Sequence, residues 1–310
     1  MSTAPIRIAI VGVGKIALDQ HLPAILGNAG FALVAVVDPR DPCIDGIAHF
    51  PSLEALLKAG PPVDAVALCT PPQIRRDLAA QAIAHGLHVF LEKPPCASLS
   101  EVAMLERMAA SAGTCLFAAW HSRFAGKVAA ARDWLSARKI QRVSIRWRED
   151  VRVWHPGQAW IWEPGGLGVF DPGINALSIA TFILPEPIFL TDAVLAFPEN
   201  RAAPIAAQLQ LRAAGGAPIA MDLDWRQTGP QSWDIEVETD MGTLGLARGG
   251  AELALGGTVE QAEDREYAGL YQHFSALVRA GGSEVDIAPL RLVADAFLRG
   301  RREMVEAFHD

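Results

Sequence analysis

The chain has 310 residues, of which 51% are hydrophobic, and a formal net charge of −8. This length exceeds what one hydrophobic core usually organises, so we expect two domains. The acidic balance argues against a nucleic-acid-binding protein, which would need a basic surface. No positively charged segment leads into an apolar run near the start, and Pro23, Gly27 and Gly30 interrupt the longest stretch without acid or base, 20–37. We therefore expect a cytoplasmic protein with neither a signal peptide nor a membrane span.

The cysteines do not point to a cross-linked or metal-bound protein. Cys43, Cys69, Cys96 and Cys115 show neither a CxxC spacing nor a paired pattern. We therefore expect reduced thiols and no cysteine-bound metal.

The first strong pattern is an apolar run, 6–13, that leads into the sequence Gly-Val-Gly-Lys-Ile-Ala. A strand followed by GxGxxA and a helix is typical of a dinucleotide-binding turn. The first glycine permits the tight turn, the second lets the backbone approach a pyrophosphate, and the alanine lets the helix pack closely. The helix then directs free N–H groups at the phosphates. The residues expected at the cofactor are Gly12, Gly14, Lys15 and Ile16.

A second apolar run, 32–37, ends at Asp38, which lies 24 residues after Gly14. An acid at about this distance commonly accepts a hydrogen bond from the ribose 2′-OH of NAD. Asp38 also begins Asp-Pro-Arg-Asp-Pro, which would make an ordinary turn. Arg40 complicates the choice because an arginine here can hold the 2′-phosphate of NADP. We expect NAD to be preferred, with NADP use possible.

Strand and helix patterns continue to alternate up to residue 120, which predicts a doubly wound parallel sheet. Strands are expected over 64–69, 87–91 and 115–120, and helices over 52–59, 74–85 and 100–112. In such sheets the ligand crevice lies at the carboxyl ends of the strands. The residues expected there are Thr70, Pro71, Glu92 and Lys93. Lys93 could contact a substrate oxygen, or it could form a merely structural surface ion pair with Glu92.

The character of the sequence changes near residue 122, where we place the boundary between domains 1–122 and 123–310. All eight tryptophans lie between Trp120 and Trp233. After one helix, 124–137, apolar and polar residues alternate, which is typical of antiparallel strands with one exposed face. Such strands are expected over 142–149, 208–212, 219–225, 233–238 and 242–247, followed by helices over 267–280 and 289–308. The predicted second domain is α+β with an open sheet, and its last helix could pack on the first domain.

Together these motifs resemble the glucose–fructose oxidoreductase and inositol dehydrogenase (Gfo/Idh/MocA) family. The glycine turn, Thr70-Pro71-Pro72, Glu92-Lys93-Pro94 and the stretch 165–175 occur in the family's order over essentially the whole chain. Residues 147–164 more specifically resemble bacterial L-arabinose 1-dehydrogenases and D-galactose 1-dehydrogenases. The resemblance implies a Rossmann domain, hydride transfer from a sugar to NAD(P)+, and a homodimer or homotetramer formed through the open sheet.

One position departs from the family, in which many members carry an aspartate and a histidine four residues apart after the glycine stretch. Here the pair is Asp171 and Asn175, and an asparagine cannot act as a base. We assign Asp171 as general base, Asn175 as an orienting residue, and Lys93 as the charge that stabilises the developing alkoxide. The alternative for Asp171 is a favourable acid in the first turn of a helix.

The remaining candidates would bind sugar hydroxyls or the sugar's flat face. The expected substrate-binding residues are His121, Glu149, Trp154 and Trp233, together with Asp171 and Asn175. We set His155 aside as an exposed loop residue, and we expect Trp134 and Trp225 to pack in the core.

The leading function is therefore an NAD(P)-dependent aldose 1-dehydrogenase that makes a lactone. The alternatives are a dehydrogenase of inositol or another secondary alcohol, and a sugar or nucleotide sensor without turnover. Lys93 and Asp171 argue against the sensor, which would have no need of a base.

Overall fold

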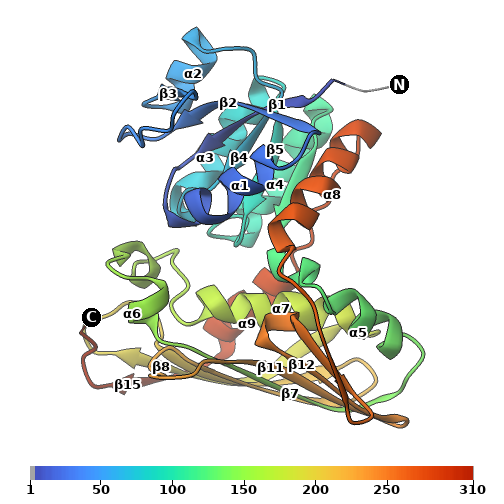
Figure 1. Cartoon of the computed structure of the whole chain (residues 1–310). Helices are drawn as coiled ribbons and strands as arrows, with labels where there is room; N and C mark the ends of the chain where they lie inside the picture. Colours follow the sequence, from blue (N-terminus) through green and yellow to red (C-terminus); the bar gives the residue numbers. More distant parts are fainter. Residues whose placement is uncertain (1–3, 310) are drawn as a thin grey trace. The chain divides into compact units, whose positions relative to one another are not determined.

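The computed structural model describes residues 4–309, and the chain divides into two compact units (Figure 1). The first unit comprises the described residues up to Trp120 together with Tyr267–Asp286. The second comprises His121–Glu266 and the described residues from Ile287 onward. Within this described part of the chain, no helix combines the length and apolar character needed to cross a membrane.

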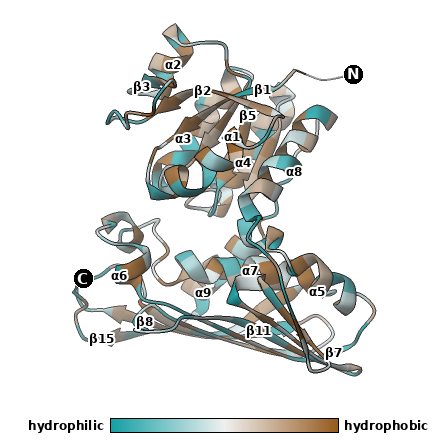
Figure 2. Cartoon of the chain, in the orientation of Figure 1, coloured by the Kyte–Doolittle hydropathy of each residue, from teal (hydrophilic) through white to brown (hydrophobic). Residues whose placement is uncertain are grey.

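The first unit is built on a six-stranded parallel sheet with the strand order β3-β2-β1-β4-β5-β6. Its strands are β1 Ile6–Val11, β2 Phe31–Val37, β3 Ala48–Phe50, β4 Ala65–Leu68, β5 His88–Glu92 and β6 Leu116–Ala119. These strands are mostly hydrophobic along their whole length (Figure 2), because both faces of the sheet are covered. This confirms the predicted doubly wound fold. The strand order reverses between β1 and β4, which is where such sheets bind ligands.

The helices of this unit begin and end close to the predicted places. They are the π-helical turn η1 Ala17–His21, α1 Leu22–Leu26, α2 Leu53–Ala59, α3 Pro72–Ala84, α4 Leu99–Ala112 and α8 Glu266–Ala280. Ser52 caps α2, and Ser98 forms a capping box with Glu101 at the start of α4. Both caps follow the sequence signals for helix starts.

Helix α8 is the element whose place the sequence did not predict. From Tyr267 on, it belongs to the first unit although it follows the second unit in the chain. Its Tyr271 stacks on Phe90 of β5 with ring centroids 5.0 Å apart, and its Phe274 stacks on Phe31 of β2. These aromatic contacts bury one side of the helix against the parallel sheet.

The second unit contains a nine-stranded, mostly antiparallel sheet with the order β14-β13-β12-β11-β7-β10-β9-β8-β15. The strands are β7 Ile140–Arg148, β8 Ile188–Pro198, β9 Ala206–Ala213, β10 Pro218–Asp224, β11 Ser232–Thr239, β12 Gly242–Ala247, β13 Glu252–Leu255, β14 Thr258–Gln261 and β15 Arg301–Val305. Only the β10–β7 and β15–β8 pairs among them are parallel. The α+β class predicted for this part of the chain is confirmed.

Helices lie on one face of this sheet (Figure 1). The helical elements of the unit are η2 His121–Phe124, α5 Val128–Leu135, α6 Val151–Trp154, η3 Ala159–Trp162, α7 Phe170–Ile183, η4 Arg248–Gly250 and α9 Ala288–Arg299. Helix α7 is apolar nearly all round and packs between α5, α9 and the sheet.

The other face of the sheet is mostly polar. Its exposed side chains include Arg142, Ser144, Arg146, Gln208, Gln210, Arg212 and Glu236. Some of them pair across strands: Arg142 bonds Glu238, and Arg148 bonds Asp222. The same face also exposes Phe189, which lies opposite Arg212, and Val259 of β14, so it is mostly but not wholly polar.

The end of the chain differs from the prediction. A helix was expected over 289–308, but α9 ends at Arg299 and the chain turns into the edge strand β15. The turn lies at Gly300, where a Cβ would sit 2.4 Å from the Ala296 carbonyl oxygen. Helix α9 is grouped with the second unit, and its packing on the first unit stays a prediction.

Candidate functional site

The glycine turn after β1 lies directly against the end of β4. Gly12 has a φ of +86°, and a Cβ at this position would sit 2.8 Å from Thr70 Cγ2. Any other residue would therefore push apart the two strands that flank the point where the strand order reverses. This is the role that the fingerprint predicts for its first glycine.

Gly14 faces open space, in contrast to Gly12. No heavy atom lies within 4 Å of the place that its Cβ would take, and Gly14, Lys15 and Ile16 are all exposed. The Leu18 N–H donates to the Gly14 carbonyl at 3.1 Å as the helix begins. The backbone here can thus be approached by a phosphate at a helix N-terminus.

Asp38 both forms a turn and braces the glycine turn. Its Oδ2 accepts a hydrogen bond from the Val13 amide at 2.9 Å, and its Oδ1 accepts one from the Arg40 amide at 2.9 Å. Burial pushes the pKa of Asp38 up, but these hydrogen bonds and the Arg40 guanidinium outweigh it and hold the pKa below its usual value. A carboxylate offers about four acceptor positions, so Asp38 retains acceptor capacity for ribose hydroxyls.

A buried arginine that the sequence did not single out ties the neighbouring strand ends together. Arg75 of α3 is 2% exposed and donates to the carbonyl oxygens of Thr70, Glu92 and Pro94. The ends of β4 and β5 are therefore held by one side chain. The only sequence signal was a charged residue on the buried face of an otherwise amphipathic helix.

These residues fit a dinucleotide. The Thr70 hydroxyl is buried and has no hydrogen-bond partner among the described residues, Gly14 leaves space beside the backbone, and Asp38 retains acceptor capacity. Asp38, Thr70 and the glycine turn follow strands that are adjacent in the sheet, so they share one edge. Pro71 is the N-cap of α3 at this edge.

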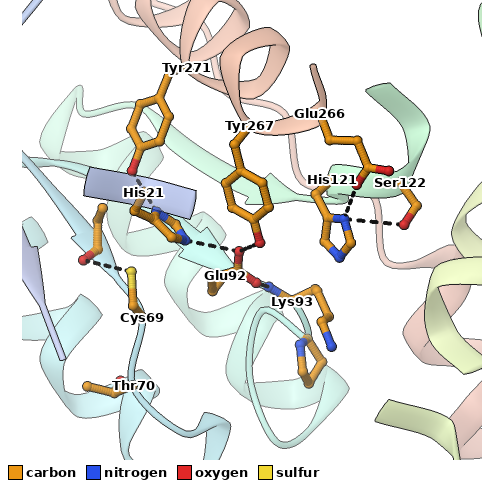
Figure 3. A network of polar contacts seen from close by, with 12 residues as sticks. His21, Cys69, Thr70, Glu92, Lys93, His121, Ser122, Glu266, Tyr267 and Tyr271 are labelled. Carbon is orange, nitrogen blue, oxygen red and sulfur yellow. Dashed lines mark hydrogen bonds and ion pairs between the residues drawn. The ribbon is translucent and has the colours of Figure 1, made fainter. Parts of the chain in front are cut away.

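Glu92 and Lys93 follow directly on the same edge. Glu92 is 3% exposed, and its Oε2 accepts the backbone N–H of Lys93 at 2.7 Å. Its Oε1 accepts the hydroxyl of Tyr267 at 2.6 Å and lies 3.1 Å from His21 Nε2 (Figure 3). Glu92 is therefore a buried acceptor for the Lys93 backbone, and the role of the Lys93 side chain stays a prediction.

In the second unit, the stretch after the two glycines 165–166 sets the start of α7. Gly168 has a φ of +55°, and a Cβ there would lie 2.3 Å from the Pro204 carbonyl oxygen. Val169 occupies the N-cap, and Asp171 is the second helical residue, only 2% exposed. Asp171 is therefore not the N-cap, and a buried carboxylate at this place needs a partner.

His155 lies beside this carboxylate. It is the C-cap residue of α6, and its Nε2 lies 3.4 Å from Asp171 Oδ2. Its Nδ1 lies 3.3 Å from Gln158 Oε1. From the sequence, His155 was expected to be an exposed loop residue, but its side chain is only 17% exposed. The position one helical turn after Asp171 holds Asn175, but a histidine from another segment, His155, lies beside Asp171.

Glu149 is buried between two tryptophans. Its Oε1 accepts Trp225 Nε1 at 3.1 Å and its Oε2 accepts Trp233 Nε1 at 2.9 Å. Trp233 in turn lies against Trp154 and Trp147, with ring centroids 5.2 and 6.0 Å away. Glu149 therefore fixes two indole rings, in addition to any hydroxyl that it accepts.

These contacts join most of the predicted sugar-binding residues of the second unit. Trp225 links the two halves, because it bonds Glu149 and lies 5.2 Å from the His155 ring. It is fully buried as expected, whereas Trp134 is only partly buried beneath Arg138. Asn175 lies one turn after Asp171 and is partly buried, so its orienting role stays a prediction.

His121 is placed differently from the tryptophan cluster. Its Nδ1 forms a short hydrogen bond with Glu266 and lies 3.3 Å from the Ser122 hydroxyl (Figure 3). The two residues in the short bond are the first and last of the long segment 121–266 of the second unit. The contact with sugar that we expect of His121 therefore remains a prediction beside this observed bond to Glu266.

Comparison with known proteins gives the same picture over the whole length. Residues 6–119 match a family model described as "Oxidoreductase family, NAD-binding Rossmann fold". A galactose 1-dehydrogenase of Pseudomonas fluorescens is 49% identical over 310 residues, covering 99% of both chains.

Two solved structures have the same fold. The crystal structure of a D-galactose-1-dehydrogenase protein from Rhizobium etli is 56% identical, has a TM-score of 0.95, and covers 100% of this chain and 99% of its own. A 3-ketoreductase from Actinomadura kijaniata, in complex with NADP and TDP-benzene, has a TM-score of 0.82 at 19% identity, covering 97% of this chain and 99% of its own. The second similarity shows the fold alone. The chain therefore belongs to the Gfo/Idh/MocA oxidoreductase family, as its motifs predicted.

Proposed function

We propose that the chain is an NAD(P)-dependent aldose 1-dehydrogenase, which oxidises the anomeric carbon of a free sugar of the D-galactose or L-arabinose type to a lactone. The observation that carries the proposal is the buried Asp171–His155 pair beside an indole cluster. It occurs in a chain that matches a galactose 1-dehydrogenase end to end. A sugar oxidoreductase is supported by that similarity, whereas inositol oxidation and sensing gain no support from it.

The chemistry requires one hydride and one proton to leave the sugar. When bound, a nicotinamide cofactor would supply the acceptor for the hydride that leaves C1. Asp171 accepts the proton of the C1 hydroxyl as C1=O forms, and His155 stabilises and orients the carboxylate. Lys93 supplies positive charge to the oxygen as its proton leaves. Asn175 and Glu149 orient hydroxyls, and Trp154 and Trp233 offer flat faces to a pyranose ring.

A spectrophotometric assay tests this function. Purified protein is mixed with NAD+ or NADP+ and a panel of free aldoses and inositols, and reduced nicotinamide is followed by absorbance. We expect reduction with D-galactose or L-arabinose and a higher kcat/KM with NAD+ than with NADP+. Reduction with inositols alone would replace this proposal by the secondary-alcohol reading, and no reduction with any compound would favour the sensor.

We also infer that the chain forms a homodimer or homotetramer through the sheet of the second unit. The exposed face carries cross-strand pairs such as Arg142–Glu238, so the contact would be mostly polar, and charge pairs at a rim weaken with salt. Light scattering should give a multiple of the 33.2 kDa chain mass, decreasing toward it as salt is raised. A monomer at micromolar concentration and low salt would contradict the inference.

A further inference from the structure

A group of four polar side chains is buried at the carboxyl end of β5, which we call the Glu92 cluster. It consists of His21, Glu92, Tyr267 and Tyr271, which are exposed by 0%, 3%, 6% and 0%. The two tyrosines are the only ones in the chain, and both come from α8, four residues apart. Burying so many polar groups costs folding free energy unless each forms a hydrogen bond. We therefore looked for a function that these hydrogen bonds serve.

The hydrogen bonds of the cluster fit one consistent proton arrangement. Burial holds the pKa of Tyr271 well above its usual value, so the phenol keeps its proton and can donate to His21 Nδ1, 2.6 Å away. His21 Nε2–H then donates to Glu92 Oε1 at 3.1 Å. A carboxylate only accepts, and Glu92 accepts from His21, from Tyr267 and from the Lys93 amide. The donors therefore converge on the Glu92 carboxylate, which joins the cluster to the backbone N–H of Lys93 (Figure 3).

Packing alone does not explain the two hydroxyl groups. Phe274, one turn after Tyr271 on the same helix, is fully buried and stacks on Phe31 and Phe117 without any polar group. Phenylalanine would serve equally at the ring contacts that Tyr271 makes with Phe90 and Phe31. The Tyr271 hydroxyl bonds His21, and the Tyr267 hydroxyl bonds Glu92.

We propose that Tyr267, Tyr271 and His21 are positioning residues for Lys93: they fix the Glu92 carboxylate, which fixes the backbone from which the Lys93 side chain extends. The proposal rests on the proposed function for its kinetic consequence, since Lys93 is there assigned to stabilise the developing alkoxide. A small displacement of a catalytic group can cost a large factor in rate, and a carboxylate held by three donors limits such a displacement of Lys93. Helix α8 thereby acts on the reaction without contacting the substrate.

The linkage to Lys93 can be read directly by NMR. The chain has five lysines, Lys15, Lys58, Lys93, Lys127 and Lys139, so protein labelled with ¹⁵N-lysine gives five backbone amide signals. The variant Lys93→Arg identifies the Lys93 signal by its loss. We expect Tyr267→Phe and the double variant Tyr267→Phe/Tyr271→Phe to move this signal by more than its linewidth, with the other four unchanged.

The functional consequence is measured with the same variants in the dehydrogenase assay. We expect kcat to fall roughly tenfold in Tyr267→Phe, with KM for sugar and cofactor within about twofold. The matched control is Phe274→Leu on the same helix, which loses buried apolar contacts but no hydrogen bond. It should lower Tm while leaving kcat and the Lys93 amide signal unchanged.

The outcomes separate this inference from the proposed function. An unmoved Lys93 amide in the double variant overturns the linkage. A moved amide with unchanged kcat overturns the positioning role, and so does an equal loss of kcat in Phe274→Leu. A wild-type protein that oxidises no sugar overturns the proposed function, and with it the kinetic role, whereas the NMR comparison still decides the linkage from Glu92 to Lys93.

Discussion

The two units build their sites in different ways. In the first unit, the candidate residues follow consecutive strands of a parallel sheet, so the glycine turn, Asp38, Thr70 and Lys93 lie on one edge by topology. In the second unit, Glu149, His155 and Asp171 come from a strand end, a short helix and the start of α7. The sequence spacing of these three residues does not predict that they lie close together.

This difference shows where local motifs carry information. A dinucleotide turn needs particular residues at fixed offsets, because the backbone itself approaches the phosphates. A sugar site needs donors, acceptors and flat apolar faces, which many residue types supply from many places. Two questions follow for experiment. The first is whether Glu149, His155 and Asp171 of the second unit work as one site. The second is whether Asp38 of the first unit binds the cofactor as its motif implies.

The largest expected effect is that of Asp171→Asn. Asparagine keeps the shape and the hydrogen-bonding reach but accepts no proton, so we expect kcat to fall by roughly 10²-fold or more. Cofactor affinity, measured by fluorescence titration, should stay close to wild type. Asn175→Ala is the companion variant, and it should raise KM more than it lowers kcat because it removes orientation. An Asp171→Asn enzyme with most of its kcat would shift the base role to Lys93.

The fold could be predicted from the sequence wherever the spacing of apolar residues and the helix-capping residues indicate the same element. Strands of the parallel sheet are continuous apolar runs, and serines mark the starts of α2 and α4. The exceptions depend on packing between distant segments. Gly300 turns the chain into β15 instead of continuing α9, and α8 joins the first unit through aromatic contacts with β2 and β5. Such contacts leave no local signal.

The site was predicted unevenly for the same reason. Asp38, Thr70 and Glu92 could be proposed from the sequence because they lie at strand ends within or after recognisable motifs. Arg75 was missed because its three partners are backbone carbonyls at or just after the ends of two strands. His155 was dismissed because its loop position suggested exposure, and only the fold brings it to Asp171. A buried acid without a histidine one turn later was the available hint that another histidine stands nearby.

The contact between His155 and Asp171 can be tested by substitution. His155→Gln should lower kcat by roughly tenfold, less than Asp171→Asn, because the imidazole supports the carboxylate rather than replacing it. Steady-state kinetics with the preferred sugar and NAD+ measure the effect. Gln158→Ala, which loses the contact to His155 Nδ1 and the hydrogen bond from Trp160 Nε1 but leaves His155 in place, is the matched control and should have a smaller effect. Equal kcat in His155→Gln and wild type would show that the 3.4 Å contact is structural only.

A smaller effect is expected in the first unit from Asp38→Ser. The carboxylate would repel a 2′-phosphate, while Arg40 nearby would attract it. Removing the acid should therefore raise the NADP/NAD ratio of kcat/KM severalfold. The variant Arg40→Ala should move the same ratio in the opposite direction. An unchanged ratio in Asp38→Ser would leave Asp38 as a turn residue that braces Val13.

The smallest effect is expected at the opposite end of β5 from Lys93, where His88 serves stability and not chemistry. Its Nδ1 accepts the Cys115 amide at 2.9 Å, and burial lowers its pKa although Asp64 acts to raise it. The folded state thus binds fewer protons than the unfolded chain, whose histidine pKa is about 6.5. Stability from this group is complete above that value and is lost as pH falls through it toward the lowered pKa.

The Tm of His88→Asn should therefore decline less than that of wild type between neutral and mildly acidic pH, with kcat unchanged. If the Tm of the variant and that of wild type declined in parallel, His88 would have the same pKa in the folded and unfolded states. A lower kcat in His88→Asn would show that His88 contributes to the reaction as well as to stability.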